Sequence, residues 1–182
     1  MPVAGIDFRI ASARDAAALV ALINSAYRGE SSRLGWTTEA DLLGGQRTDL
    51  DEVSALIAAP ESRFLLGETP NPDAAGCDLL GCLHLGREGA AASLGMFAIR
   101  PGLQGRGLGR GFMHEAEARV RAWWGSERVR MSVISLREDL IEYYVRRGYR
   151  RTGETAPFPA GDPRCGLPRV DGLEFAILEK VF

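Results

Sequence analysis

The sequence LGMFAIRPGLQGRGLGR, from Leu94 to Arg110, carries the strongest structural signal in this chain. Its first part, Leu94 to Ile99, is an apolar run that predicts a buried strand. Pro101 and Gly102 end the strand, because proline cannot donate to a sheet and glycine loosens the backbone. A helix is predicted from there to about Trp124, since apolar residues recur at spacings of three and four on one face: Phe112, Met113, Ala116, Val120 and Trp123.

The glycine-rich turn between this strand and this helix predicts an anion-binding site. Glycines let the backbone approach a ligand closely, and the first N–H groups of a helix have no acceptor within it. The helix dipole adds partial positive charge, which favours a phosphate. Arg106 and Arg110 add cationic donors. The predicted site consists of Gln104, Gly105, Arg106, Gly107, Leu108, Gly109 and Arg110.

Two common nucleotide-binding motifs do not match this turn. A Walker loop requires a lysine, and a Rossmann turn requires Gly-x-Gly-x-x-Gly, whose last position here is Arg110, Phe112 or His114. The pattern Gln/Arg-x-x-Gly-x-Gly/Ala does match, through Gln104, Gly107 and Gly109. It resembles the pyrophosphate loop of the GNAT superfamily of acyl-CoA-dependent N-acyltransferases. The alternative interpretation is a surface turn rich in arginine and glycine.

Length and composition favour one globular domain spanning residues 1–182. The chain has 182 residues, of which 46% are hydrophobic and 25% charged, so it can build a sizeable core. The formal net charge of −2 gives no indication of a nucleic-acid or anionic-membrane partner. No apolar window reaches the length of a membrane span, and no secretion signal is recognisable.

The cysteine pattern favours reduced thiols and a cytoplasmic location. Cys77, Cys82 and Cys165 are an odd number without a secretion signal. Cys77, Cys82 and His84 match no standard zinc spacing, so we expect core packing there and no metal site.

Turn and periodicity signals predict an α/β (α+β) fold with about seven strands. Ser12 and Asp15 have the spacing of a capping box, which starts a helix that Gly29 ends. Short connections make the second to fourth strands an antiparallel meander, with a loop at 68–76, whereas the helical connection makes the fourth and fifth strands parallel. Two further helices are expected, at 49–58 and 138–147. The expected strands are 7–10, 63–66, 78–85, 91–99, 128–134, 149–154 and 173–181.

A second motif strengthens the resemblance. The sequence from Tyr144 to Tyr149, YVRRGY, is similar to the GNAT pattern Tyr-x-x-x-Gly-Phe/Tyr, and the predicted order of elements is that of the family. The resemblance implies a central mixed, mostly antiparallel sheet flanked by helices, with the fourth and fifth strands parallel and splayed. It also implies acetyl-CoA as cosubstrate, without a metal.

The resemblance assigns residues to the cofactor. The backbone of Met96, Phe97 and Ala98 would pair with the pantetheine arm. Tyr144 would protonate the leaving thiolate, as a phenol with a pKa of about 10 is protonated at neutral pH. Its neighbour Tyr143 is expected to face elsewhere. Where many members carry an asparagine, this chain has Arg137, so either Ser135 replaces the polar contact or Arg137 reaches a phosphate.

The acceptor is a primary amine by this resemblance: a small amine, an amino acid or a peptide N-terminus. The region shaping its site would include Glu30, Trp36 and Glu39, with a short helix from Thr37 or Thr38 to Leu43. An alternative is that Trp36 packs on the domain and the acids are solvated.

Direct attack requires a deprotonated amine, and Glu30, His84 and Glu174 are candidate bases, although a histidine on a strand is more often a core residue. The proline-rich segment 155–172 is expected to cover the acceptor. A non-catalytic acyl-CoA sensor is the alternative function, and the chain is expected to be a monomer or homodimer.

Overall fold

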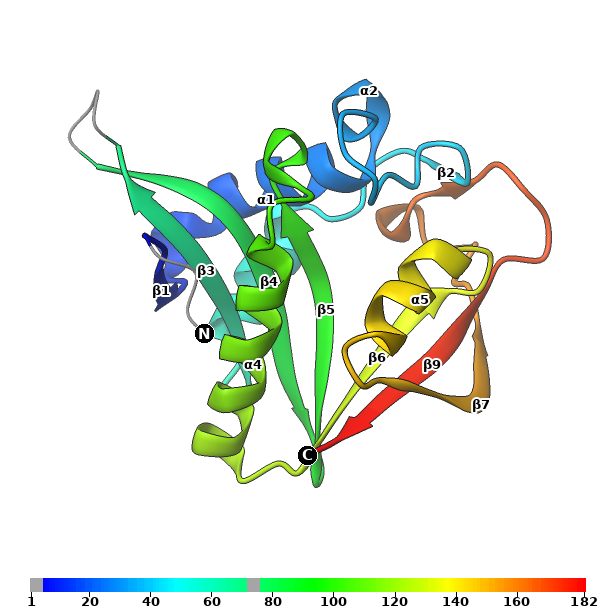
Figure 1. Cartoon of the computed structure of the whole chain (residues 1–182). Coiled ribbons are helices and arrows are strands. Elements are labelled where there is room, and N and C mark those ends of the chain that lie inside the picture. The colour runs from blue at the N-terminus through cyan, green and yellow to red at the C-terminus, as the bar shows by residue number, and fades with distance from the viewer. Residues whose placement is uncertain (1–4, 72–75) are drawn as a thin grey trace.

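A central sheet organises the computed structural model, which describes residues 5–71 and 76–182. The sheet has seven strands in the order β1-β3-β4-β5-β6-β9-β7 (Figure 1). All pairs are antiparallel except β5 and β6, which are parallel. The predicted α/β fold, the meander and the parallel pair are therefore confirmed. The strands are β1 (Asp7–Ile10), β3 (Ser62–Pro70), β4 (Cys77–Glu88), β5 (Ala91–Ile99), β6 (Arg128–Ile134), β7 (Arg150–Pro157) and β9 (Glu174–Val181).

Helices cover both faces of this sheet. One core cluster joins the sheet to the apolar sides of α4 and α5, and a second joins it to α1 and α3. Within residues 5–71 and 76–182, no helix has the length and apolar character needed to cross a bilayer. The helices are α1 (Ala16–Tyr27), α2 (Gly29–Ser32), α3 (Leu50–Ala58), α4 (Leu108–Trp124) and α5 (Glu138–Val145), with 3₁₀ turns at Ala13–Asp15, Pro101–Leu103 and Pro163–Cys165.

Local capping signals place the helix starts where the sequence predicts them. The backbone N–H of Ser12 donates to Oδ2 of Asp15 at 2.7 Å, which completes the expected reciprocal cap at the first turn. The Asp49 side chain accepts the backbone N–H of Glu52 at 2.8 Å and caps α3. Side chains that satisfy the free N–H groups of a first turn therefore fix where these helices begin.

One expectation about the region before α3 is wrong. The helix predicted from Thr37 or Thr38 to Leu43 is absent, and the only helical turn near it is α2, four residues long. Instead, β2 (Leu43–Gly44) pairs with β8 (Leu167–Pro168) in a separate two-stranded sheet. A strand of two residues has no periodicity to detect, and its pairing is set by a partner far away in sequence.

Two smaller expectations also differ from the structure. Strand β3 continues to Pro70, so the loop expected at 68–76 is shorter, and its residues 72–75 lie outside the described residues. Trp123 is 36% exposed, whereas Trp124 packs against the core. The apolar face of α4 steps by four residues from Val120 to Trp124, rather than by three to Trp123.

Strands β5 and β6 separate after a short contact, and this separation positions the site. They pair only at Ala92–Val129 and Ser93–Arg130, and then diverge along their length (Figure 1). Further along β5, the register with β4 shifts between Cys82 and His84, opposite Met96, whose φ is +45°. A bulge leaves one residue outside the ladder and bends its strand. The backbone of β5 beyond Ser93 is therefore open on the β6 side.

Candidate active site

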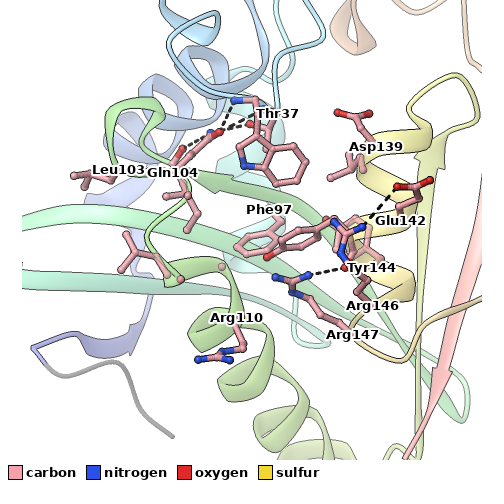
Figure 2. Close-up of a pocket in the computed structure, with 18 of the residues that line it drawn as sticks. Thr37, Phe97, Leu103, Gln104, Arg110, Asp139, Glu142, Tyr144, Arg146 and Arg147 are labelled. Atoms are coloured by element: carbon pink, nitrogen blue, oxygen red, sulfur yellow. Dashed lines mark hydrogen bonds and ion pairs between the residues drawn. The ribbon is translucent and has the colours of Figure 1, made fainter.

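A cleft of about 780 Å³ lies between the β5–α4 connection and α5. Its walls come from the open edge of β5, from the glycine-rich turn and from one side of α5 (Figure 2). Of the predicted cofactor residues, those that line this cleft are Phe97, Gln104, Gly105, Gly107, Leu108, Gly109, Arg110 and Tyr144.

The glycine-rich turn has the conformation that an anion cradle requires. Gly105 and Gly107 have φ values of +78° and +83°, and Gly107 is the N-cap of the 17-residue helix α4. A Cβ on Gly109 would collide with the hydroxyl of Tyr143. Each of these glycines is therefore needed locally, either for a left-handed backbone or for a close approach. Arg106 is exposed and is not one of the residues lining the cleft.

The side chain of Gln104 binds the protein itself. Its Oε1 accepts the backbone N–H groups of Trp36 and Thr37 at 2.9 and 3.3 Å. Its Nε2 donates to Thr37 Oγ1 at 2.8 Å and to the carbonyl of Ile99 at 3.0 Å. This glutamine therefore ties the turn after β5 to residues 36–37 (Figure 2), and it also lines the cleft.

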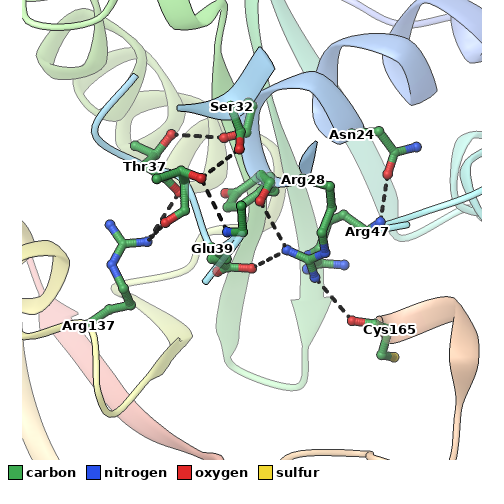
Figure 3. Close-up of polar contacts among 12 residues, drawn as sticks. Asn24, Arg28, Ser32, Thr37, Glu39, Arg47, Arg137 and Cys165 are labelled. Atoms are coloured by element: carbon green, nitrogen blue, oxygen red, sulfur yellow. Dashed lines mark hydrogen bonds and ion pairs between the residues drawn. The ribbon is translucent and has the colours of Figure 1, made fainter. Parts of the chain in front are cut away.

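Arg137 does not take the position expected for a phosphate contact. It is 8% exposed, and its guanidinium donates to the carbonyls of Trp36, Thr37 and Thr38 at 2.8–3.2 Å. It also forms an ion pair with Asp139 at 3.0 Å, which lowers the pKa of that carboxyl. Ser135 donates its backbone N–H to Glu174, and neither Ser135 nor Arg137 lines the cleft. Arg137 thus holds residues 36–38 against α5 (Figure 3).

Tyr143 faces the cleft, contrary to expectation. Its ring lies 5.1 Å from the ring of Trp36, with which it spans the cleft between α5 and residues 36–37. The Arg147 guanidinium lies 3.3 Å from the Tyr143 ring centroid, and its Nη1 donates to the Tyr143 carbonyl at 2.6 Å. Arg147 Nε is buried and has no hydrogen-bond partner among the described residues. Consecutive helix positions can both line a wide cleft, because they differ by only about 100° in direction.

Tyr144 lies where the cleft meets a second, smaller cavity of about 120 Å³. It is 6% exposed, and among the described residues no hydrogen bond to its hydroxyl occurs. Burial, together with the neighbouring Tyr27 and Tyr143, raises its pKa well above 10. The phenol is therefore protonated at neutral pH and available as a donor. The other residues shared by both cavities are Tyr27, Phe97 and Leu140.

Tyr27, the last residue of α1, lines both cavities, although the sequence does not identify it as a site residue. Its hydroxyl donates to the carbonyl of Phe97 at 2.6 Å, next to the bulge at Met96. Burial raises the pKa of this phenol. A left-handed conformation is unfavourable for a residue such as methionine, so external contacts must hold it. Tyr27 supplies one such contact to β5.

The smaller cavity contains a buried ion pair. Arg28 Nη1 lies 2.5 Å from Glu39 Oε2, and the two residues are 5% and 8% exposed. Arg28 also donates to the carbonyl of Cys165 at 3.2 Å, which connects α1 to the proline-rich segment (Figure 3). Glu39 was an expected acceptor contact, but Arg28 was not, because the Cys165 carbonyl that it binds lies 137 residues away in sequence.

The three candidate bases lie outside both cavities. Glu30 is on the surface, with a 92% exposed side chain paired to Arg33 at 3.2 Å. His84 packs on Phe64, and its Nε2 lies 2.7 Å from Ser62 Oγ. Burial lowers the pKa of His84 to about 4. Glu174 is exposed at the start of β9. These positions give no support to a role as base. For His84 and Glu174 the sequence could not place the side chain, because alternation along a strand does not tell which face meets the cleft.

Solved structures resemble this fold at low sequence identity. An IAA acetyltransferase from Bacillus cereus aligns with a TM-score of 0.65 at 10% identity, covering 97% of this chain and 99% of that one. A Vibrio cholerae spermidine N-acetyltransferase, in complex with CoA and spermine, aligns with a TM-score of 0.67 at 15% identity, covering 98% of this chain and 96% of that one. Nourseothricin acetyltransferase aligns with a TM-score of 0.64 at 17% identity, covering 97% of this chain and 98% of that one. No curated protein matches the chain.

The family model described as acetyltransferase (GNAT) family matches residues 32–149. That range contains the glycine-rich turn, the open edge of β5 and Tyr144. The chain belongs to the GNAT acetyltransferase family.

Proposed function

We propose that this protein is an N-acetyltransferase that moves an acetyl group from acetyl-CoA to a primary amine. The observation that carries the proposal is the divergence of β5 and β6 directly beside the glycine-rich turn. An open strand edge offers N–H and C=O groups to the amides of a pantetheine arm, and a helix N-terminus offers N–H groups to a pyrophosphate. Both features border one cleft.

The charges of the cleft suit a phosphorylated cosubstrate. Arg110, Arg146 and Arg147 line it, together with Asp139 and Glu142. Both acids already have arginine partners, since Asp139 pairs with Arg137 and Glu142 with Arg146. Arg110 and Arg147 form no ion pair with a described residue and can bind phosphate oxygens.

The residues at the junction of the two cavities supply the chemistry. We propose that the neutral amine forms a bond to the thioester carbonyl carbon, that the C–S bond then breaks, and that Tyr144, kept protonated by its raised pKa, donates a proton to the departing thiolate. The proton that the amine nitrogen loses restores the phenol of Tyr144. The bulge at Met96 and Phe97 provides backbone N–H groups for the carbonyl oxygen of the thioester. Glu39 is the one carboxylate among the described residues lining the smaller cavity, and its charge is already compensated by the ion pair with Arg28.

The test is thiol release from acetyl-CoA with a panel of primary amines. We expect amine-dependent release by the wild type, and a fall in kcat of about 10²- to 10⁴-fold in Tyr144→Phe, the usual contribution of a general acid. Tyr149→Phe is the matched control, since Tyr149 is also buried but lies outside both cavities. Undiminished turnover in Tyr144→Phe would remove the proposed acid. Cofactor binding without any amine-dependent release would instead indicate a sensor of acyl-CoA.

A further inference from the structure

The charged residues around the smaller cavity are unbalanced. The described residues that line it include three charged side chains, Arg28, Glu39 and Arg47. Two are cationic and one is anionic, so the lining carries one excess positive charge. All three lie in the connection between α1 and α3 (Figure 3).

Arg28 and Glu39 neutralise one another. Their ion pair of 2.5 Å is almost fully buried, and Arg28 makes further bonds to the carbonyls of Cys165 and Tyr27. Removing one partner of such a pair leaves an uncompensated buried charge, which strongly destabilises the folded protein. The Nη1 and Nη2 groups of Arg28 are therefore committed to the protein, whereas its buried Nε has no hydrogen-bond partner among the described residues. Because the charge of Arg28 is compensated by Glu39, it is unsuited to exchanging partners with a ligand.

Arg47 carries the excess positive charge of this lining. It forms no ion pair with any carboxylate in the described part of the chain. It is half-buried, and its guanidinium lies 5.8 Å from the centroid of the Tyr27 ring. The Asn24 side chain accepts its backbone N–H at 2.6 Å and fixes the backbone at this position. A partly desolvated guanidinium without an acidic partner is a receptor for a carboxylate or similar anion.

We propose that the acceptor is a small amine that also carries an anionic group, and that Arg47 binds that group. The inference rests on the proposed function and adds the substrate class. The amine would lie toward Tyr144 and Phe97, which border both cavities, and the anion toward Arg47. A volume of about 120 Å³ suits an amino acid of few carbons. A polyamine would instead place a second cation near Arg47, where like charges repel.

The test compares three amines of equal chain length: propylamine, β-alanine and 1,3-diaminopropane. Their kcat/KM values are measured by thiol release with saturating acetyl-CoA. We expect β-alanine to exceed the other two by about tenfold or more, the usual effect of a hydrogen bond to a charged group. In Arg47→Gln the ratio of β-alanine to propylamine should fall about tenfold, with Arg47→Lys intermediate. Arg14→Gln, at an exposed arginine outside both cavities, should keep the ratio.

The outcomes separate this inference from the proposed function. If propylamine or 1,3-diaminopropane is the best substrate, or if Arg47→Gln leaves the ratio unchanged, the anionic acceptor is wrong and the transferase assignment stands. If Arg47 had only a structural role, Arg47→Gln would change kcat/KM for all three amines by the same factor. That result would also overturn the inference. Absence of acetyl-CoA binding and of thiol release with every amine would overturn the proposed function, and the acceptor class with it. Replacing β-alanine by 2-aminoethylphosphonate tells whether the anion is a carboxylate or a phosphonate-like group.

Discussion

The absence of a side chain at Gly166 allows the proline-rich segment to pack over the smaller cavity. Its φ is +105°, and a Cβ there would lie 3.0 Å from Arg28 Nη2 and 3.1 Å from the Gly44 carbonyl. Gly166→Ala should therefore displace residues 158–168, because the backbone conformation and the space both disfavour a side chain. Phe158, Pro159 and Cys165 from this segment line the cavity.

We expect Gly166→Ala to raise the acceptor KM several-fold and to leave the affinity for acetyl-CoA unchanged, as measured by thiol release and calorimetry. Gly161→Ala is the control, since nothing lies within 4 Å of a Cβ at that position. An unaltered acceptor KM in Gly166→Ala would mean that this segment does not shape the acceptor site.

His84 should make stability depend on pH. Burial lowers its pKa to about 4, below the ordinary value of about 6.5. The unfolded chain therefore binds more protons between these two values, and the contribution present above pH 6.5 is lost as the pH falls to 4. This contribution of His84 to the free energy of unfolding is at most about 3 kcal/mol.

Urea unfolding at several pH values tests this expectation, with His84→Gln as the non-titrating comparison. Between pH 6.5 and 4, the wild type should lose more free energy of unfolding than the variant does. If the free energy of unfolding changed equally with pH in both proteins, His84 would keep its ordinary pKa in the folded state. The variant should also retain thiol release, since His84 lies outside both cavities.

At the scale of elements, Gln104 joins the turn before α4 to the segment that follows α2. It makes four hydrogen bonds, to Trp36, Ile99 and, twice, Thr37. Each is worth about 1 kcal/mol net, less where it is exposed to water. Gln104→Ala should therefore destabilise the fold by about 1–3 kcal/mol. It should also weaken acetyl-CoA binding, because the turn loses its anchor.

Urea unfolding and calorimetric titration measure both effects. Gln46→Ala is the matched control, at an exposed glutamine with one bond of 3.3 Å to Asp49. Normal stability together with normal acetyl-CoA affinity in Gln104→Ala would contradict the anchoring role.

At the scale of the whole molecule, patterns that are local in sequence predicted most of the fold. Apolar runs, capping residues and short connections indicated the seven strands, the meander and the parallel pair β5–β6. The glycine-rich turn was predictable because its chemistry depends on consecutive residues. The pairing of β2 with β8 was not, since two residues carry no pattern.

The parts of the site that were missed depend on distant contacts. Arg28 meets Glu39 and Cys165 only in the folded chain, and Arg137 binds carbonyls about 100 residues away in sequence. Tyr143 was misplaced because the orientation of one side chain within an element depends on tertiary packing, whereas His84 has the core position that is usual for a histidine on a strand. Local patterns thus predict elements better than they predict which polar groups meet between them.

Calorimetric titration of the wild-type protein with acetyl-CoA tests the central claim most directly, with NAD and ATP as parallel titrants. The open edge of β5 beside the glycine-rich turn predicts saturable binding of acetyl-CoA at one site per chain and much weaker binding of NAD and ATP. Absence of acetyl-CoA binding by folded protein, or equal binding of all three, would contradict the claim that this cleft is a site for the pantetheine and pyrophosphate of acetyl-CoA.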